Sequence, residues 1–168
     1  NYRVIDSYTF NDQTYILEVD KANNNESNVI LTIVENKNIT LSKVIKEKVE
    51  ASFNKIIVDE EGIYILGTIY KEGYSIDLYL MKLDYSYNIV FESTIGGSGV
   101  DNLTDVTLYG DYLFLTGNTT SSGGYFSGVR KQEDSFVMKV TKDLFNVDKV
   151  IVNTLTNINS NTDITIKD

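Results

Sequence analysis

The sequence predicts an all-β fold made of consecutive four-stranded antiparallel units, and two observations carry this prediction. The first is an internal repeat: the segment IIVDEEGIYILGT, which begins at Ile56, recurs as VTLYGDYLFLTGN from Val106, an offset of 50 residues. The second is that apolar and polar residues alternate within these segments, which are interrupted by turn residues such as Gly110-Asp111. Such alternation is typical of half-buried strands, and Gly-Asp pairs between two of them favour hairpins.

The repeat extends beyond this pair of segments. DLYLMKL from Asp77 recurs as DSFVMKV from Asp134 at an offset of 57, so seven extra residues lie in the loop after Gly117. A weaker copy begins at Thr14, and residues 162–166 resemble residues 104–108. A period of 40–50 residues with four short strands per unit is typical of β-propeller blades. The sequence therefore predicts propeller-like blades at residues 1–50, 51–97 and 98–156, with a partial fourth at 157–168.

The first blade is predicted to hold strands at residues 4–10, 15–19, 29–34 and 39–49. An Asn-rich polar segment at 21–28 favours a turn between the second and third strands. Residues 43–50 carry enough Lys and Glu to form helical i,i+4 pairs. We nevertheless predict a strand there, because Ile45 and Val49 alternate with charged neighbours as on the outer edge of a blade.

The second blade is predicted at 55–59, 63–69, 77–83 and 88–94, and the third at 103–109, 112–118, 135–140 and 148–153. We expect Gly110 and Asp111 to form the tightest hairpin, because such a turn needs positive backbone φ angles. Four residues recur at blade-equivalent positions and are predicted to pack between neighbouring sheets: Phe114, Leu115, Phe136 and Met138.

No linker or shift in composition divides the 168 residues, so we predict one domain. Three blades and one strand pose a problem, because closed propellers generally have four to eight blades. Open ends would leave apolar sheet faces uncovered, and such faces normally mark interfaces. We favour a piece of a larger propeller, with self-association second and an open, solenoid-like stack third. The strand predicted at 161–167 would need another sheet, in the same chain or in a second copy, to pair with.

A family resemblance is carried by three motifs: GGSG-x-D at 96–101, the Thr-Gly strand end at 116–117, and D-x-F-V-x-K at 134–139. In this order they resemble bacterial SBBP-type β-propeller repeats, most closely over residues 55–140. The resemblance implies an extracellular or cell-surface propeller, a family whose ligands are mostly unknown. We therefore expect a secreted or cell-surface location. The GGSG motif occurs once in the chain, so its role is not repeated in every blade.

Composition excludes several classes of function. The net charge of −9 and a pI near 4.5, with no basic stripe, make nucleic acid and anionic membranes poor partners. No apolar run approaches the roughly 20 residues of a membrane span. The chain has no His and no Cys, which removes the commonest general base, nucleophile and zinc ligands. We predict no catalytic residues, no metal and no cofactor, and a solvated acidic surface, with attraction of cations as the alternative.

The candidate ligand-binding residues lie on the face where we expect residues 71–76, 96–102 and 119–133 to gather, between blades and between second and third strands. In the long loop 119–133, Tyr125 and Phe126 lie near Arg130, a combination suited to sugar stacking or a peptide contact. The alternative is that the two aromatic rings fold back over the blade. Asp101 follows the glycine cluster 96–99, which either makes a tight inter-blade crossing or holds an anion through its N–H groups.

Aspartates recur around these connections. We expect Asp101 and Asp105 to bond backbone amides at the crossing, and Asp77 and Asp134 to cap the third strands of their blades. One Asp per blade at a fixed position is typical of a structural hydrogen bond, and the D-x-[DN]-x-[DN]-G calcium spacing is absent.

Three functional hypotheses follow. The first is a non-catalytic surface or secreted module that binds protein or carbohydrate. The second is a structural or oligomerisation scaffold for a larger multidomain protein. The third is an enzyme resembling glycoside hydrolases with an acidic site in the channel, which finds little support because carboxylates such as those of residues 59–61 fall in a predicted tight turn.

Overall fold

The computed structural model describes residues 2–21, 23, 25–73, 75–126 and 133–153, and every regular element in them is a β-strand. The first sheet has the order β1-β2-β3-β4, the second β5-β6-β7-β8 and the third β9-β10-β11-β12, with all neighbours antiparallel. The strands are β1 (Tyr2–Phe10), β2 (Gln13–Lys21), β3 (Ser27–Glu35), β4 (Asn38–Val49), β5 (Ala51–Asp59), β6 (Gly62–Lys71), β7 (Ser75–Leu83), β8 (Ile89–Ile95), β9 (Asp101–Tyr109), β10 (Tyr112–Thr119), β11 (Asp134–Thr141) and β12 (Val147–Asn153). The twelve strands predicted within residues 4–153 are all present.

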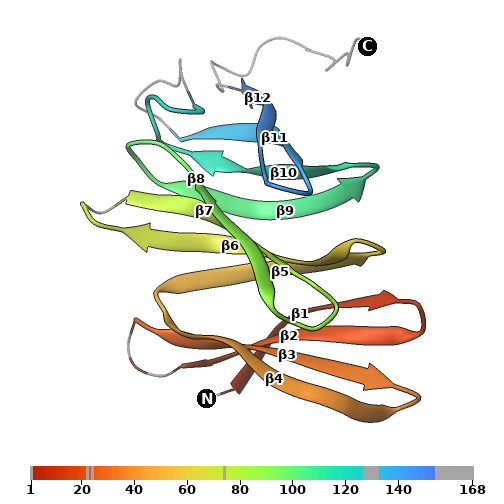
Figure 1. Cartoon of the computed structure of the whole chain (residues 1–168). Coiled ribbons are helices and arrows are strands. Elements are labelled where there is room, and N and C mark those ends of the chain that lie inside the picture. Colours follow the sequence, from red (N-terminus) through yellow and green to blue (C-terminus); the bar gives the residue numbers. More distant parts are fainter. Residues whose placement is uncertain (1, 22, 24, 74, 127–132, 154–168) are drawn as a thin grey trace, which may run out of the picture.

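The three sheets stack face to face along the chain (Figure 1). One apolar core, which includes Leu17, Leu31 and Ile65, lies between the first and second sheets. A second core, which includes Leu66 and Leu115, lies between the second and third. The predicted antiparallel four-stranded units are therefore confirmed, and the described residues form three blade-like sheets without closing into a ring. The strand predicted at 161–167 lies outside the described residues.

The first strand of each sheet contacts the first strand of the next. The Asp6 carboxylate accepts a hydrogen bond from Ile56 N–H at 3.1 Å, and the Asn54 amide donates to the Leu103 carbonyl at 3.2 Å. Lys55 forms an ion pair with Asp105 at 3.1 Å. Each of β1, β5 and β9 also has a bulge at the same place along the strand. The repeat therefore includes the first fifty residues, although their sequence similarity to the other two units is weak.

Turn chemistry matches the sequence at most hairpins. Asn11, Asp12, Asn36 and Lys37 all have positive φ, as two-residue hairpin turns require. Gly110 has φ 55° and makes the predicted turn between β9 and β10. That turn is not the tightest, because the β1–β2, β3–β4 and β5–β6 hairpins also have two-residue connections.

The prediction that Phe114 packs between sheets is wrong. In β10, Leu113, Leu115 and Gly117 face the neighbouring sheet and are buried, whereas Phe114 lies on the opposite face and is half-buried. Adjacent residues of a strand point to opposite faces, so Phe114 and Leu115 cannot both enter one core. Phe136 and Met138 are buried between the sheets, as predicted.

The outer faces of the two terminal sheets are more polar than the sequence analysis predicted. In the second sheet, Ile57, Leu66 and Leu78 pack against the third sheet. At the equivalent positions, the outer face of the third sheet has Thr107, Thr116 and Ser135, whereas Phe114 and Val137 keep the apolar character of Tyr64 and Leu80. The first sheet shows the same change, with Ser7, Thr9, Thr14 and Thr32 in place of Ile56, Val58, Ile63 and Met81. Polar residues at some outer positions are found on the capping units of repeat proteins, and here they reduce the apolar area of the two outer faces.

Candidate functional site

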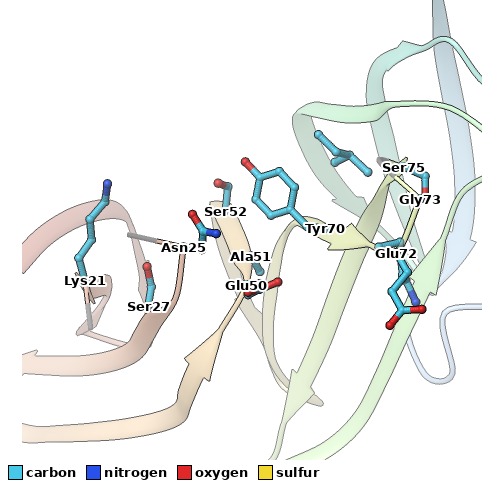
Figure 2. Close-up of a pocket in the computed structure, with 12 residues that line it drawn as sticks. Lys21, Asn25, Ser27, Glu50, Ala51, Ser52, Tyr70, Glu72, Gly73 and Ser75 are labelled. Atoms are coloured by element: carbon cyan, nitrogen blue, oxygen red, sulfur yellow. The ribbon is translucent and has the colours of Figure 1, made fainter. Parts of the chain in front are cut away.

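The loops between the second and third strands of each sheet and the links between successive sheets gather at one end of the stack, on the left in Figure 1. At this end a cleft of about 800 Å³ opens between the first and second sheets. Figure 2 shows Lys21, Asn25 and Ser27 of the first sheet on one side and Tyr70 of β6 on the other. Its volume falls in the range of small-ligand sites. This is the face on which the sequence predicted ligand binding, but the cleft lies at a different junction.

The length of the inter-sheet link explains why the cleft lies here. β4 and β5 are joined by Glu50 alone, whereas residues 96–100 join β8 to β9. The longer link packs against the start of the β10–β11 loop: Gly99 N–H donates to Ser121 Oγ at 2.9 Å and Val100 N–H to Thr120 Oγ1 at 2.9 Å. The corresponding space between the second and third sheets is thereby filled. Between the first and second sheets a single residue leaves it open.

Tyr70 is the exposed aromatic residue of the cleft. Its N–H donates to the Glu50 carbonyl at 3.1 Å, and the equivalent bond one unit later joins Thr120 N–H to the Val100 carbonyl at 2.9 Å. The backbone of Tyr70 is therefore held by a contact that recurs in the repeat. Tyr70 is 54% exposed, and in Figure 2 its ring extends from the β6 side of the cleft toward the first sheet.

Polar side chains at the two junctions differ in whether their hydrogen-bonding capacity is used. At the second junction, Asp101 accepts hydrogen bonds from Gly97 N–H and Ser121 Oγ, each at 2.9 Å, and from Thr119 Oγ1. Around the cleft, the side chains of Ser52 and Ser75 form no hydrogen bond with any other described residue. Buried polar groups are normally paired within the protein, so the second junction is structural. Ser52 and Ser75 are accessible from the cleft and form no such bonds within the described protein.

Of the four predicted ligand-binding residues, two are structural. Phe126 is 0% exposed, and its ring centroid lies 5.1 Å from that of Phe136, so the folded-back alternative describes it correctly. Asp101 is also 0% exposed, with its oxygens occupied as described above. Neither side chain can reach a ligand, because the neighbouring sheet and loop cover them. Tyr125 is 51% exposed on the same end of the stack, and Arg130 lies outside the described residues.

The recurring aspartates are only partly as predicted. Asp101 bonds a backbone amide at the crossing, but Asp105 lies in the middle of β9, where it accepts from Val106 N–H at 2.9 Å. Asp134 begins β11 and Asp77 is the third residue of β7, and each has one buried carboxylate oxygen without a hydrogen-bond partner among the described residues. The predicted capping bonds are therefore missing for these two oxygens.

Asp77 also explains why residue 96 is a glycine. A Cβ at Gly96 would lie 2.3 Å from Asp77 Oδ1, closer than atoms can approach. Burial and the nearby Asp101 raise the pKa of Asp77, and Lys71 opposes this shift. Within the described part of the chain no three acidic side chains are grouped so as to hold a metal ion.

Sequence reasoning named the β6–β7 loop as part of the ligand face but missed Tyr70 itself. One signal was present: the residue 50 positions later is Thr120, so Tyr70 breaks the repeat with a large aromatic. The openness of the cleft had no local signal, because it depends on how the first and second sheets meet.

No known family model and no curated protein matches this chain. The resemblance to SBBP-type repeats therefore stays a prediction from the residues quoted above. In the part of the chain that the structure describes, there is no helix long and apolar enough to cross a membrane.

Proposed function

We propose that this chain is a non-catalytic, secreted or cell-surface binding module that takes a carbohydrate or protein ligand in the cleft between the first and second sheets. One observation carries the proposal: the exposed Tyr70 lines the cleft together with Ser52 and Ser75, whose side chains form no hydrogen bond with another described residue. Concave sites with an aromatic wall and a few convergent polar groups are typical of ligand binding. The location rests on the family resemblance alone.

Catalysis in the cleft would depend on its carboxylates. Glu50 and Glu72 both line it, and both are exposed to water. A glycoside hydrolase needs one carboxylic acid that stays protonated, which enzymes achieve by removing it from water. We therefore expect binding without turnover, and hydrolysis of a bound glycan that is lost in Glu50→Gln or Glu72→Gln would overturn this part of the proposal.

The test compares two exposed tyrosines on the same end of the stack. Purified wild type, Tyr70→Ala and Tyr125→Ala are each applied to a glycan array and to a displayed library of extracellular peptides. Loss of a large stacking residue costs a binding site about tenfold or more, so we expect Tyr70→Ala to lose the ligands of the wild type. Tyr125→Ala is the matched control, since its side chain is 51% exposed against 54% for Tyr70.

The binding pattern of the three proteins shows where the ligand site lies and whether there is one. Binding that is lost in Tyr125→Ala and kept in Tyr70→Ala would move the site to the β10–β11 loop that the sequence first indicated. Ligands bound equally by all three proteins would place the site elsewhere. Absence of any wild-type ligand on either platform would favour the scaffold hypothesis and overturn the proposed function.

A further inference from the structure

We infer that the ligand of the cleft is a neutral oligosaccharide, stacked on the ring of Tyr70. This inference rests on the proposed function and narrows it from two classes of ligand to one. Three features of the cleft carry it: the ring, the kind of polar groups around it and the balance of charge.

The ring of Tyr70 offers a flat apolar surface with a polar end. The Tyr70 N–H donates to the Glu50 carbonyl at 3.1 Å, so the strand that carries the ring is already ordered before a ligand binds. Rigid, amphipathic rings of this kind suit ligands that have an apolar face and a wet edge. A pyranose meets that description, because its axial C–H groups form a face and its hydroxyls form the edge.

The remaining lining favours hydroxyl groups over amino-acid side chains. Ser27, Ser52, Ser75 and Asn25 supply short donors and acceptors, and a sugar hydroxyl can both donate and accept. A peptide would instead need apolar pockets for anchor residues, which usually dominate protein interfaces. The apolar lining consists of Ala51 and Ile76 with Tyr70, and Ala51 is itself buried in the inter-sheet core.

The charges of the cleft cancel, although the chain as a whole carries −9. The charged residues that line the cleft are two cations, Lys21 and Lys71, and two anions, Glu50 and Glu72. Specific recognition of an ion requires a site of the opposite sign, because complementary potential selects the partner and like charge rejects it. A balanced site within an acidic molecule gives neither anionic nor cationic sugars an advantage.

The experiment measures binding of the full chain to three oligosaccharide series of equal length by calorimetry: neutral hexoses, uronic acids and hexosamines. We expect the neutral series to bind, with an affinity that changes less than about threefold between low and high salt, because an uncharged ligand leaves nothing for salt to screen. Tyr70→Phe keeps the ring and should retain affinity within about threefold, whereas Tyr70→Ala should lose about tenfold or more. Tyr125→Ala should match the wild type, and thermal melting confirms that every variant is folded.

The outcomes separate this inference from the function it rests on. Preference for uronic acids or hexosamines, with affinity that falls as salt rises, would overturn the neutral-glycan inference and leave the binding site in place. Tyr70-dependent binding of a peptide, with no sugar bound, would do the same. If no ligand of any class depends on Tyr70, both the inference and the proposed function fail.

Discussion

At the scale of single residues, one buried ion pair joins the second and third sheets at the end of the stack opposite the cleft. Lys142 Nζ lies 2.8 Å from Asp59 Oδ2 and 2.9 Å from Glu61 Oε1, and both Lys142 and Asp59 are buried. Burial alone would raise the pKa of Asp59, but hydrogen bonds from Lys142 and from Glu61 N–H outweigh it and leave that pKa lowered. Burial would likewise lower the pKa of Lys142, and its two carboxylate partners raise it instead.

We expect Lys142→Met to lower the free energy of unfolding by about 3–5 kcal/mol near pH 7, because it leaves the Asp59 carboxylate buried without a partner. A lowered folded-state pKa stabilises the protein above the unfolded pKa of about 3.9, and this stability is lost as pH falls through the folded value. The difference in free energy of unfolding between wild type and variant should therefore decrease below about pH 4, as urea titrations at several pH values can measure. The control is Lys139→Met, whose pair with Asp148 at 2.7 Å is partly exposed and should contribute far less to stability than the buried pair. A difference in free energy of unfolding that does not change with pH would contradict stabilisation by the ionised Asp59–Lys142 pair.

At the scale of one element, β10 shows how alternation divides neighbouring residues between two faces. Leu115 packs into the core between the second and third sheets, and Phe114 lies half-buried on the outer face. We expect Leu115→Ala to cost about 2–5 kcal/mol, because it leaves a cavity in a packed core. Phe114→Ala should cost less than about 2 kcal/mol, because only part of its ring leaves water on folding. Urea unfolding of the two variants measures both values. Equal losses would show that another surface covers this face in solution.

At the scale of the whole molecule, the stack has two packed interfaces and two outer faces on which polar and apolar residues are mixed. Self-association is the second assembly that the sequence favours, and Thr107, Thr116 and Ser135 on the outer face of the third sheet reduce the apolar area that it could bury. We expect the wild type to sediment as a monomer at micromolar concentration, and a variant with Thr107→Ile, Thr116→Leu and Ser135→Leu to associate. These changes give the outer face of the third sheet the same residue types as Ile57, Leu66 and Leu78, with which the second sheet packs against the third. Wild-type protein that associates as strongly as the variant would place the contact on another surface.

The sequence by itself determined the strands, their order and their grouping in fours. Each of these features depends on a local pattern: apolar alternation sets a strand, and short Gly or Asn turns bring the next strand back beside it. The repeat then carries the pattern from one unit to the next, which is why even the weakly similar first fifty residues were assigned correctly.

Only the tertiary structure decided which side chains are available to a ligand. Tyr125 and Phe126 are neighbours in one polar loop, yet Phe126 is buried against Phe136 and Tyr125 is exposed. The cleft likewise exists because Glu50 alone links the first two sheets, while residues 96–100 fill the equivalent space at the next junction. A residue's own segment fixes the face on which it lies. What lies opposite that face depends on how two sheets pack, and this is set by residues far apart in the chain.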